Sequence, residues 1–191
     1  MTDLKKKDET AAEHGKCMLN RREFLMYSGT AAVAASTISV SLAPGQASAK
    51  AHVVTYPRKL VGKLSQLKEN QPVDFRYPDD GPNSQCFVVK MAGAKAGGGV
   101  GPQRDVVGFS YLCTHQGGFL NGKYQAVGDH RVLGQCPLHL STYDLTRHGI
   151  IISGQAYQSI PQVLLELDGD DIYAVGMMGL LFGRSQNLMD S

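Results

Sequence analysis

The sequence predicts an all-β protein, built as an antiparallel sandwich or a small barrel. From residue 52 onward, short runs of β-branched and aromatic residues alternate with Gly, Pro, Asp and Asn, a pattern typical of strands separated by turns. No long segment places apolar residues at helical spacing, and no motif recurs at a fixed period. The chain has 191 residues and a formal net charge of +2. These values favour one domain and argue against nucleic acid or anionic lipid as the partner.

The expected strands follow one another in six runs. The last run opens the clearest hairpin, in which two apolar stretches flank residues 168–170. Residues 92–102 are glycine-rich but lack the Gly-Lys-Ser/Thr ending of a phosphate-binding loop, so we expect an ordinary loop there. The six runs cover residues 52–60, 72–78, 85–91, 105–112, 130–135 and 162–167.

Residues 1–49 have the marks of an export signal. Arg21 and Arg22 are adjacent, a mildly apolar run of small residues covers 27–43, and Ala-Ser-Ala follows at 47–49. A charged start, a short apolar stretch and a small-residue exit are typical of a secretory signal peptide. The paired arginines make the segment resemble a twin-arginine signal.

We expect cleavage after Ala49, which would leave residues 50–191 as the mature domain in the periplasm. The alternative is a retained membrane anchor, but the apolar run is short for a span that needs about 20 apolar residues. The twin-arginine route carries folded proteins, which indicates that a cofactor is inserted before export.

Two cysteine–histidine pairs are the strongest chemical signal in the chain. Cys113 and His115 are separated by one residue, and Cys136 and His139 by two. Common zinc signatures instead group like ligands, with two cysteines followed by two histidines. A [2Fe–2S] centre with two cysteines on one iron and two histidines on the other fits one Cys and one His from each of two loops.

At these positions the sequence resembles the Rieske family, whose fold is an antiparallel β sandwich or small barrel with an inserted cluster-binding subdomain. The resemblance implies a [2Fe–2S] cluster of the Rieske type, bound by Cys113, His115, Cys136 and His139 on loops within about residues 111–156. It also implies that hydroxyls two and four residues after the second histidine raise the reduction potential, because they stabilise the charge gained on reduction. Those hydroxyls, and the residues matching a loop that covers the cluster, are Ser141, Tyr143, Gly149, Gly154 and Ala156.

One departure from the family concerns the disulfide that joins the two cluster loops in many Rieske proteins. The corresponding positions are occupied by Gly118 and Leu138, so no disulfide can link the loops. We therefore expect packing and hydrogen bonds to hold them. Gly117 and Gly118 should let the backbone approach the cluster closely.

The remaining candidates have simpler interpretations. His130 and His148 match neither motif and are expected to be surface or loop residues. Cys86 lies in an apolar run and is expected to be a buried strand residue, not a ligand. Asp79 is expected to lie in a turn, as are the acidic residues at 168–171.

The function depends on the redox partner, because a Rieske cluster has no open coordination site and no other catalytic group is apparent. The segments at 75–90 and 97–118, with the twin-arginine start, resemble those of arsenite oxidase small subunits. This resemblance implies arsenite as the reductant, a molybdopterin-containing large subunit, and a cytochrome c or cupredoxin as acceptor.

Three alternatives stay open. The Rieske subunit of a cytochrome bc complex would keep a strongly apolar membrane helix and usually the disulfide. A dioxygenase ferredoxin would lack an export signal. A binding protein with a zinc site would contain neither iron nor sulfide.

Overall fold

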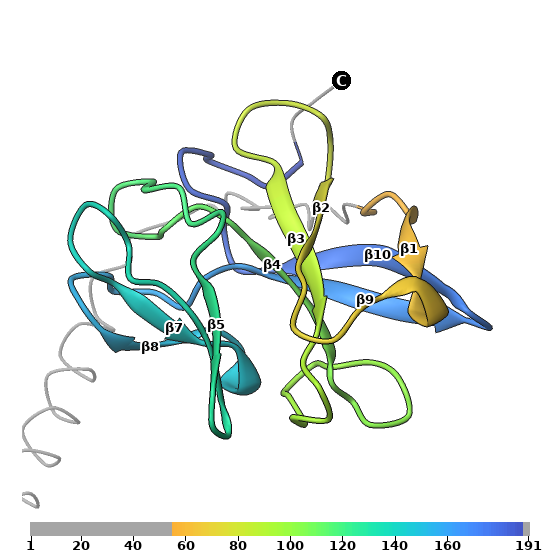
Figure 1. Cartoon of the computed structure of the whole chain (residues 1–191). Coiled ribbons are helices and arrows are strands. Elements are labelled where there is room, and N and C mark those ends of the chain that lie inside the picture. Colours follow the sequence, from red (N-terminus) through yellow and green to blue (C-terminus); the bar gives the residue numbers. More distant parts are fainter. Residues whose placement is uncertain (1–54, 189–191) are drawn as a thin grey trace, which may run out of the picture. The chain divides into compact units, whose positions relative to one another are not determined.

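Ten β-strands form two antiparallel sheets in the computed structural model, which describes residues 55–188 (Figure 1). The larger sheet has six strands in the order β1-β10-β9-β4-β3-β2. Its strands are β1 (Lys59–Lys63), β10 (Asp171–Met178), β9 (Gln162–Asp168), β4 (Val106–Ser110), β3 (Gln85–Lys90) and β2 (Val73–Arg76).

The smaller sheet has four strands that follow one another in chain order. They are β5 (Tyr124–Val127), β6 (His130–Leu133), β7 (Thr142–Asp144) and β8 (Ile150–Ser153). Two single turns of 3-10 helix, Leu64–Gln66 and Leu145–Arg147, complete the regular structure of the described residues. Within this part of the chain no helix is long and apolar enough to cross a membrane.

The four-stranded sheet and its loops are an insertion into the larger sheet. β4 pairs directly with β9, with Gly108 opposite Val163 and Phe109 opposite Gln162. Residues 111–161 leave the larger sheet after β4, and the chain returns to that sheet at β9. The predicted all-β fold with an inserted subdomain is confirmed.

One hydrophobic core joins the two sheets. Phe87 and Phe109, from β3 and β4, pack in the same buried cluster as Leu133, Tyr143 and Leu145 of the inserted subdomain. The central strands β3 and β4 are buried along nearly their whole length. This explains why their sequences are continuous apolar runs without alternation. Because this core continues into both cysteines of the motif, the insertion is packed against the main sheet.

The strands mostly lie where the sequence predicts them, with differences at the first run and inside the insertion. β1 begins at Lys59, near the end of the run 52–60, and Pro57 lacks the backbone N–H that a strand pairing needs. Residues 52–54 lie outside the described part of the chain. The runs do not include β5, β7 or β8, which have three or four residues each. The hairpin is confirmed: Asp168 pairs with Asp171 across a two-residue turn.

Candidate metal centre

Two hydrogen-bonded loops carry the cysteine–histidine pairs. In the first loop (113–118), the Cys113 N–H donates to the carbonyl of Gly118 at 2.9 Å, and the Gly117 N–H donates to the Cys113 carbonyl at 2.9 Å. The second loop (136–141) repeats this pattern, since the Cys136 N–H donates to Ser141 and the Cys136 carbonyl accepts from Leu140. Each cysteine therefore anchors its loop through both of its backbone groups.

The structure brings the two loops together at their cysteines. Cys113 and Cys136 are both buried, and each thiol affects the pKa of the other. A Cβ atom on Gly118 would lie 2.5 Å from the Cys136 Sγ, which is too close for any side chain. Glycine at this position therefore allows the first loop to approach the sulfur of the second.

The two histidines also meet, and they lie nearer the surface than the cysteines. The rings of His115 and His139 have centroids 4.6 Å apart and an interplanar angle of 81°. Both residues are half-buried. The Nδ1 atom of His139 is buried and has no hydrogen-bond partner. A buried ring nitrogen without a partner is costly unless another group binds it. Imidazole nitrogen is the commonest protein ligand of metal ions.

The electrostatics of the cysteines favour one thiolate before the other. Burial opposes ionisation of Cys113, but hydrogen bonds from the Tyr143 hydroxyl and the His115 backbone bring the Cys113 pKa below its ordinary value. Burial dominates at Cys136 and raises the pKa of that thiol. Burial, followed by the Cys113 sulfur, raises the pKa of Tyr143, so its phenol stays protonated and able to donate.

The Tyr143 hydroxyl is oriented by Thr114, which follows the first cysteine. The Thr114 N–H donates to the Tyr143 oxygen at 3.1 Å, and the Thr114 hydroxyl donates to the Gln158 carbonyl at 2.7 Å. The Tyr143 oxygen lies 3.2 Å from the Cys113 Sγ. A metal-bound sulfur is a thiolate and can only accept, so Tyr143 is the donor in that state.

The Ser141 hydroxyl is held by the third loop (154–161), which connects β8 to β9. It accepts hydrogen bonds from the backbone N–H groups of Gln155 at 3.2 Å and Ala156 at 3.1 Å. The Ser141 hydroxyl proton stays available for a hydrogen bond to the Cys113 sulfur, and Ser141 is among the groups that lower the pKa of Cys113. Gly154 lies directly against Ser141, since a Cβ there would meet the Ser141 Cα at 2.2 Å. The third loop is therefore packed on the second loop.

The other residues selected from the sequence lie where they were expected. Cys86 is buried in β3, and burial raises the pKa of its thiol to about 12. His130 is exposed at the start of β6, and His148 is exposed but hydrogen-bonds Gln162 at 2.8 Å. Asp79 lies in a turn and accepts from the Gly81 N–H, as expected. Sequence reasoning missed its ion pair with a distant arginine.

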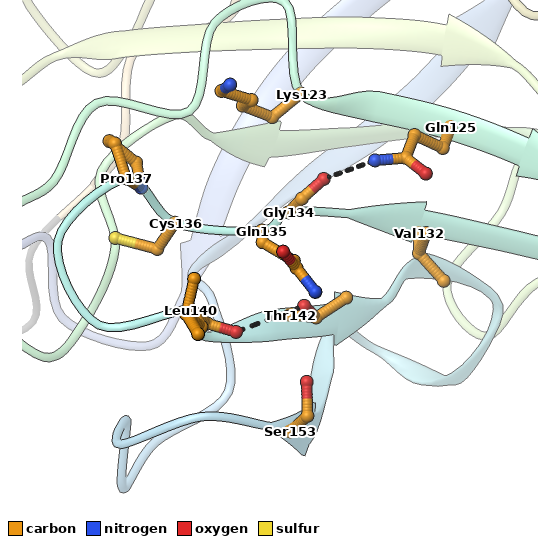
Figure 2. Close-up of a pocket in the computed structure, with 10 residues that line it drawn as sticks. All are labelled: Lys123, Gln125, Val132, Gly134, Gln135, Cys136, Pro137, Leu140, Thr142 and Ser153. Carbon is orange, nitrogen blue, oxygen red and sulfur yellow. Dashed lines mark hydrogen bonds between the residues drawn. The ribbon is translucent and has the colours of Figure 1, made fainter.

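A hollow of about 710 Å³ lies beside the second loop (Figure 2). Its lining residues come from β5, β6, β7, β8 and the second loop, which contributes Cys136 and Leu140. Figure 2 shows the Gln125 side chain donating to the Gly134 carbonyl at 2.8 Å, which ties β5 to the residues just before the second loop. Lys123 is the charged residue in the lining of the hollow.

The donor set fits a binuclear cluster better than a single ion. Within residues 55–188, no three His, Cys, Asp or Glu side chains are placed to hold one metal ion together. A Rieske centre makes a different demand, because one iron takes two cysteines and the other takes two histidines. The structure provides a buried pair of thiols and an adjacent pair of imidazoles. Cys113, Cys136, His115 and His139 could hold such a cluster.

Comparisons with known proteins identify relatives of this chain. No protein-family model matches the chain. The chain is 50% identical over 182 residues to the iodate reductase subunit IdrB of Denitromonas iodatirespirans, covering 94% of this chain and 92% of that protein. It is 46% identical over 169 residues to the iodate reductase subunit IdrB of Pseudomonas sp. (strain SCT), covering 88% and 84%.

Among solved structures, the soluble domain of Rieske protein II from Sulfolobus acidocaldarius superposes with a TM-score of 0.58 at 25% identity. The alignment covers 69% of this chain and 83% of that domain. The fold, the two loops and the extent of identity lead to one conclusion: the chain belongs to the Rieske family, in the group of the iodate reductase subunit IdrB, and carries a Rieske [2Fe–2S] cluster.

Proposed function

We propose that Cys113 and Cys136 bind one iron of the cluster and that His115 and His139 bind the other. The observation that carries this assignment is the pairing of two buried thiols beside two half-buried imidazoles, one of which has a buried nitrogen without a partner. When bound, the cluster supplies one-electron transfer. The histidine pair is the part of the site nearer to solvent.

The surroundings of the histidines fit contact with a redox partner. Leu138, Leu140 and Tyr157 are exposed by 52%, 58% and 88%. The Tyr157 ring lies 6.4 Å from the ring of His115. Exposed apolar side chains grouped around a functional centre are typical of interaction surfaces. This chain thus has a surface through which electrons could enter or leave beside the histidines, while the rest of the site stays buried.

We propose that the chain is the electron-transfer subunit of an iodate reductase, and that it transfers electrons between a molybdopterin-containing large subunit and a cytochrome c or cupredoxin. The relatives at 50% and 46% identity, both named iodate reductase subunits, support iodate as the substrate of the complex. Arsenite oxidation is the second candidate, and the sequence segments that resemble arsenite oxidase small subunits favour it. The two candidates require opposite directions of electron flow.

The ligand assignment is tested by the composition of the purified chain. We expect two irons and two sulfides per chain, and an EPR-active reduced state with mixed nitrogen and sulfur ligation. Cys113→Ser should abolish the cluster, whereas Cys86→Ser should retain it, because Cys86 packs in a different hydrophobic cluster from Cys113 and Cys136. One tightly bound zinc with no iron would contradict the assignment.

The substrate is tested by mixing the chain with its large subunit. With the large subunit present, iodate should reoxidise the dithionite-reduced cluster, and without it the reduced cluster should stay reduced. Reduction of the oxidised cluster by arsenite in the complex would instead support the second candidate. A cytochrome bc subunit would be reduced by quinol in its own complex. Turnover of iodate by the isolated chain would contradict a purely electron-transferring role.

We also propose that residues 1–49 are a twin-arginine signal and that residues 50–191 work in the periplasm. The support is the sequence alone, because these first residues lie outside the described part of the chain. Replacing Arg21 and Arg22 by lysines should keep the charge but leave the precursor in the cytoplasm. Fractionation followed by immunoblotting measures this. Normal export of the double variant would exclude the twin-arginine route.

A further inference from the structure

The chain continues beyond β10 into a segment that folds back on the body of the domain. This C-terminal strap (179–187) is anchored by Leu181, which is buried in a cluster with Tyr77 and Cys86. The strap is also closed on itself, because Asn187 accepts from the Leu181 N–H at 2.9 Å and donates to the Gly179 carbonyl at 2.7 Å. These contacts give the strap a defined path.

A partly buried ion pair fixes the strap to the turn between β2 and β3. The side chain of Arg184 is only 3% exposed, and its guanidinium donates to both carboxylate oxygens of Asp79, at 2.7 and 2.9 Å. It donates further to the Pro82 carbonyl and to the Ser84 hydroxyl. A bidentate ion pair of this kind fixes both the orientation of the two side chains and the distance between them. The middle of the strap is therefore held rigidly.

Phe182, which follows the buried Leu181 in the strap, lies against the first cluster loop. A Cβ atom on Gly117 would lie 2.5 Å from the Phe182 Cε1 and 2.6 Å from its Cδ1. Gly117 also has a φ of +69°, a conformation that other residues adopt only with strain. A groove lined by Thr114, Gln158 and the strap runs along this contact. In Figure 1 the dark-blue C-terminal segment is drawn beside the green first loop.

No disulfide links the first loop to the second. All three cysteines in the described residues are free. At the positions where many Rieske proteins have a disulfide, the Leu138 side chain lies 3.3 Å from where a Gly118 Cβ would be. The two loops thus touch there only by van der Waals contact. The opposite side of the first loop, at Gly117, is where the strap contacts it.

We propose that the strap acts as the clamp of the first cluster loop, with Phe182 and Arg184 as positioning residues that set how firmly the cluster is held and how far water reaches it. This proposal rests on the ligand assignment given above. Phe182 covers the backbone of the first loop, and Arg184 holds Phe182 in place. Solvent exposure is one of the factors that set the potential of an iron–sulfur cluster. Water admitted at the loop would stabilise the added negative charge of the reduced state.

The test compares purified, cluster-containing variants. Phe182→Ala removes the ring and Arg184→Ala releases the strap, so both should lose the cluster several-fold faster under a chelator and show a raised potential. Hydrogen exchange of the peptide covering 113–118 should also increase. Phe182→Leu keeps an apolar side chain at this position, so it should keep cluster retention, potential and hydrogen exchange close to those of the wild type. The control is Tyr173→Ala, which removes a half-buried aromatic from β10 where it lies beneath Arg58.

Each outcome decides the question. If Phe182→Ala and Arg184→Ala match the Tyr173→Ala control in cluster retention, potential and exchange, the strap is not a clamp. If they lose the cluster only together with global unfolding, the role is general stability and the proposal is wrong. Should the alanine variants not accumulate, Phe182→Leu and Arg184→Lys must show the same changes at smaller amplitude. A wild-type chain without iron would overturn the ligand assignment instead.

Discussion

The hydroxyls of Ser141 and Tyr143 both have their acceptor positions occupied by backbone N–H groups. Gln155 and Ala156 donate to Ser141, and Thr114 donates to Tyr143. Each hydroxyl proton is therefore directed elsewhere, and the Tyr143 oxygen lies 3.2 Å from the Cys113 Sγ. Donors aimed at a metal-bound sulfur stabilise the reduced state more than the oxidised state, which raises the potential.

Ser141→Ala and Tyr143→Phe should each lower the reduction potential while leaving the four ligands unchanged. A hydrogen bond to a charged group is worth about 1.5–3 kcal/mol. For one electron, about 59 mV corresponds to about 1.4 kcal/mol, so the upper limit per bond is roughly 60–130 mV. The measured shift should be smaller, because the oxidised cluster also accepts the bond. Film voltammetry measures the potential.

Iron content and the EPR signal serve as controls for these two variants, and both should match the wild type. The double variant should fall further than either single variant, without strict additivity, because both donors act on one charge. Single shifts below about 20 mV, well under the one-bond limit, would show that the hydroxyls do not act on the cluster.

Cys86 should be chemically silent in the folded protein. Burial in β3 raises the pKa of its thiol to about 12, and the thiolate is the reactive form. At pH 8 roughly one thiol in ten thousand would then be ionised. Iodoacetamide should leave the Cys86 peptide unmodified under native conditions and label it after unfolding, as mass spectrometry can show. Rapid native labelling would mean that β3 opens far more often than its burial indicates.

At the scale of an element, the third loop depends on a glycine that packs on the second loop. Gly154 has a φ of +91°, and a Cβ there would overlap the Ser141 Cα at 2.2 Å. Gly122 has a similar φ of +72° but no atom within 4 Å of its Cβ position. The two positions differ in packing while both require a positive φ.

Gly154→Ala should destabilise the domain clearly more than Gly122→Ala. The control substitution carries only backbone strain, about 1–2 kcal/mol, whereas the overlap at Ser141 forces the third loop away and adds to that strain. Urea unfolding measures the difference in free energy, and the reduction potential shows whether the Ser141 hydroxyl has moved. Equal losses in the free energy of unfolding for the two variants would show that the third loop moves away from Ser141 without an added free-energy cost.

The elements differ in how far their sequences predict them. The continuous apolar runs of β3 and β4 and the hairpin around residues 168–170 are recognisable because burial and turn chemistry leave local patterns. β7 has three residues, and its ends are set by contacts with β6 and β8 that no local pattern encodes. The cysteine–histidine motifs are predictable because ligand type and spacing are chemical demands on consecutive residues.

At the scale of the whole molecule, the contacts that sequence reasoning missed join residues far apart in the chain. Arg184 pairs with Asp79, 105 residues away, and Phe182 lies on Gly117. A lone arginine near the C-terminus and an aspartate in a turn carry no signal of each other. The glycines of the first loop do predict a close approach, but not what approaches. Tertiary packing alone supplies that information.

The same Asp79–Arg184 pair makes the free energy of unfolding of the domain depend on pH. The Arg184 hydrogen bond is the largest effect on Asp79 and holds the pKa of that carboxyl well below its ordinary value. A depressed folded-state pKa contributes stability above the unfolded pKa of about 3.9, and that stability is lost as the pH falls through the folded pKa. Asp79→Asn cannot ionise, so it lacks this contribution at every pH and leaves the buried Arg184 unpaired.

The wild type should therefore have a higher urea midpoint than Asp79→Asn at pH 6, measured by circular dichroism. The gap between the two midpoints should narrow below about pH 4. Because Asp79 is about one-third exposed, solvent screening should keep the narrowing small. A gap that stays constant down to pH 3 would show that the carboxylate charge does not stabilise the fold.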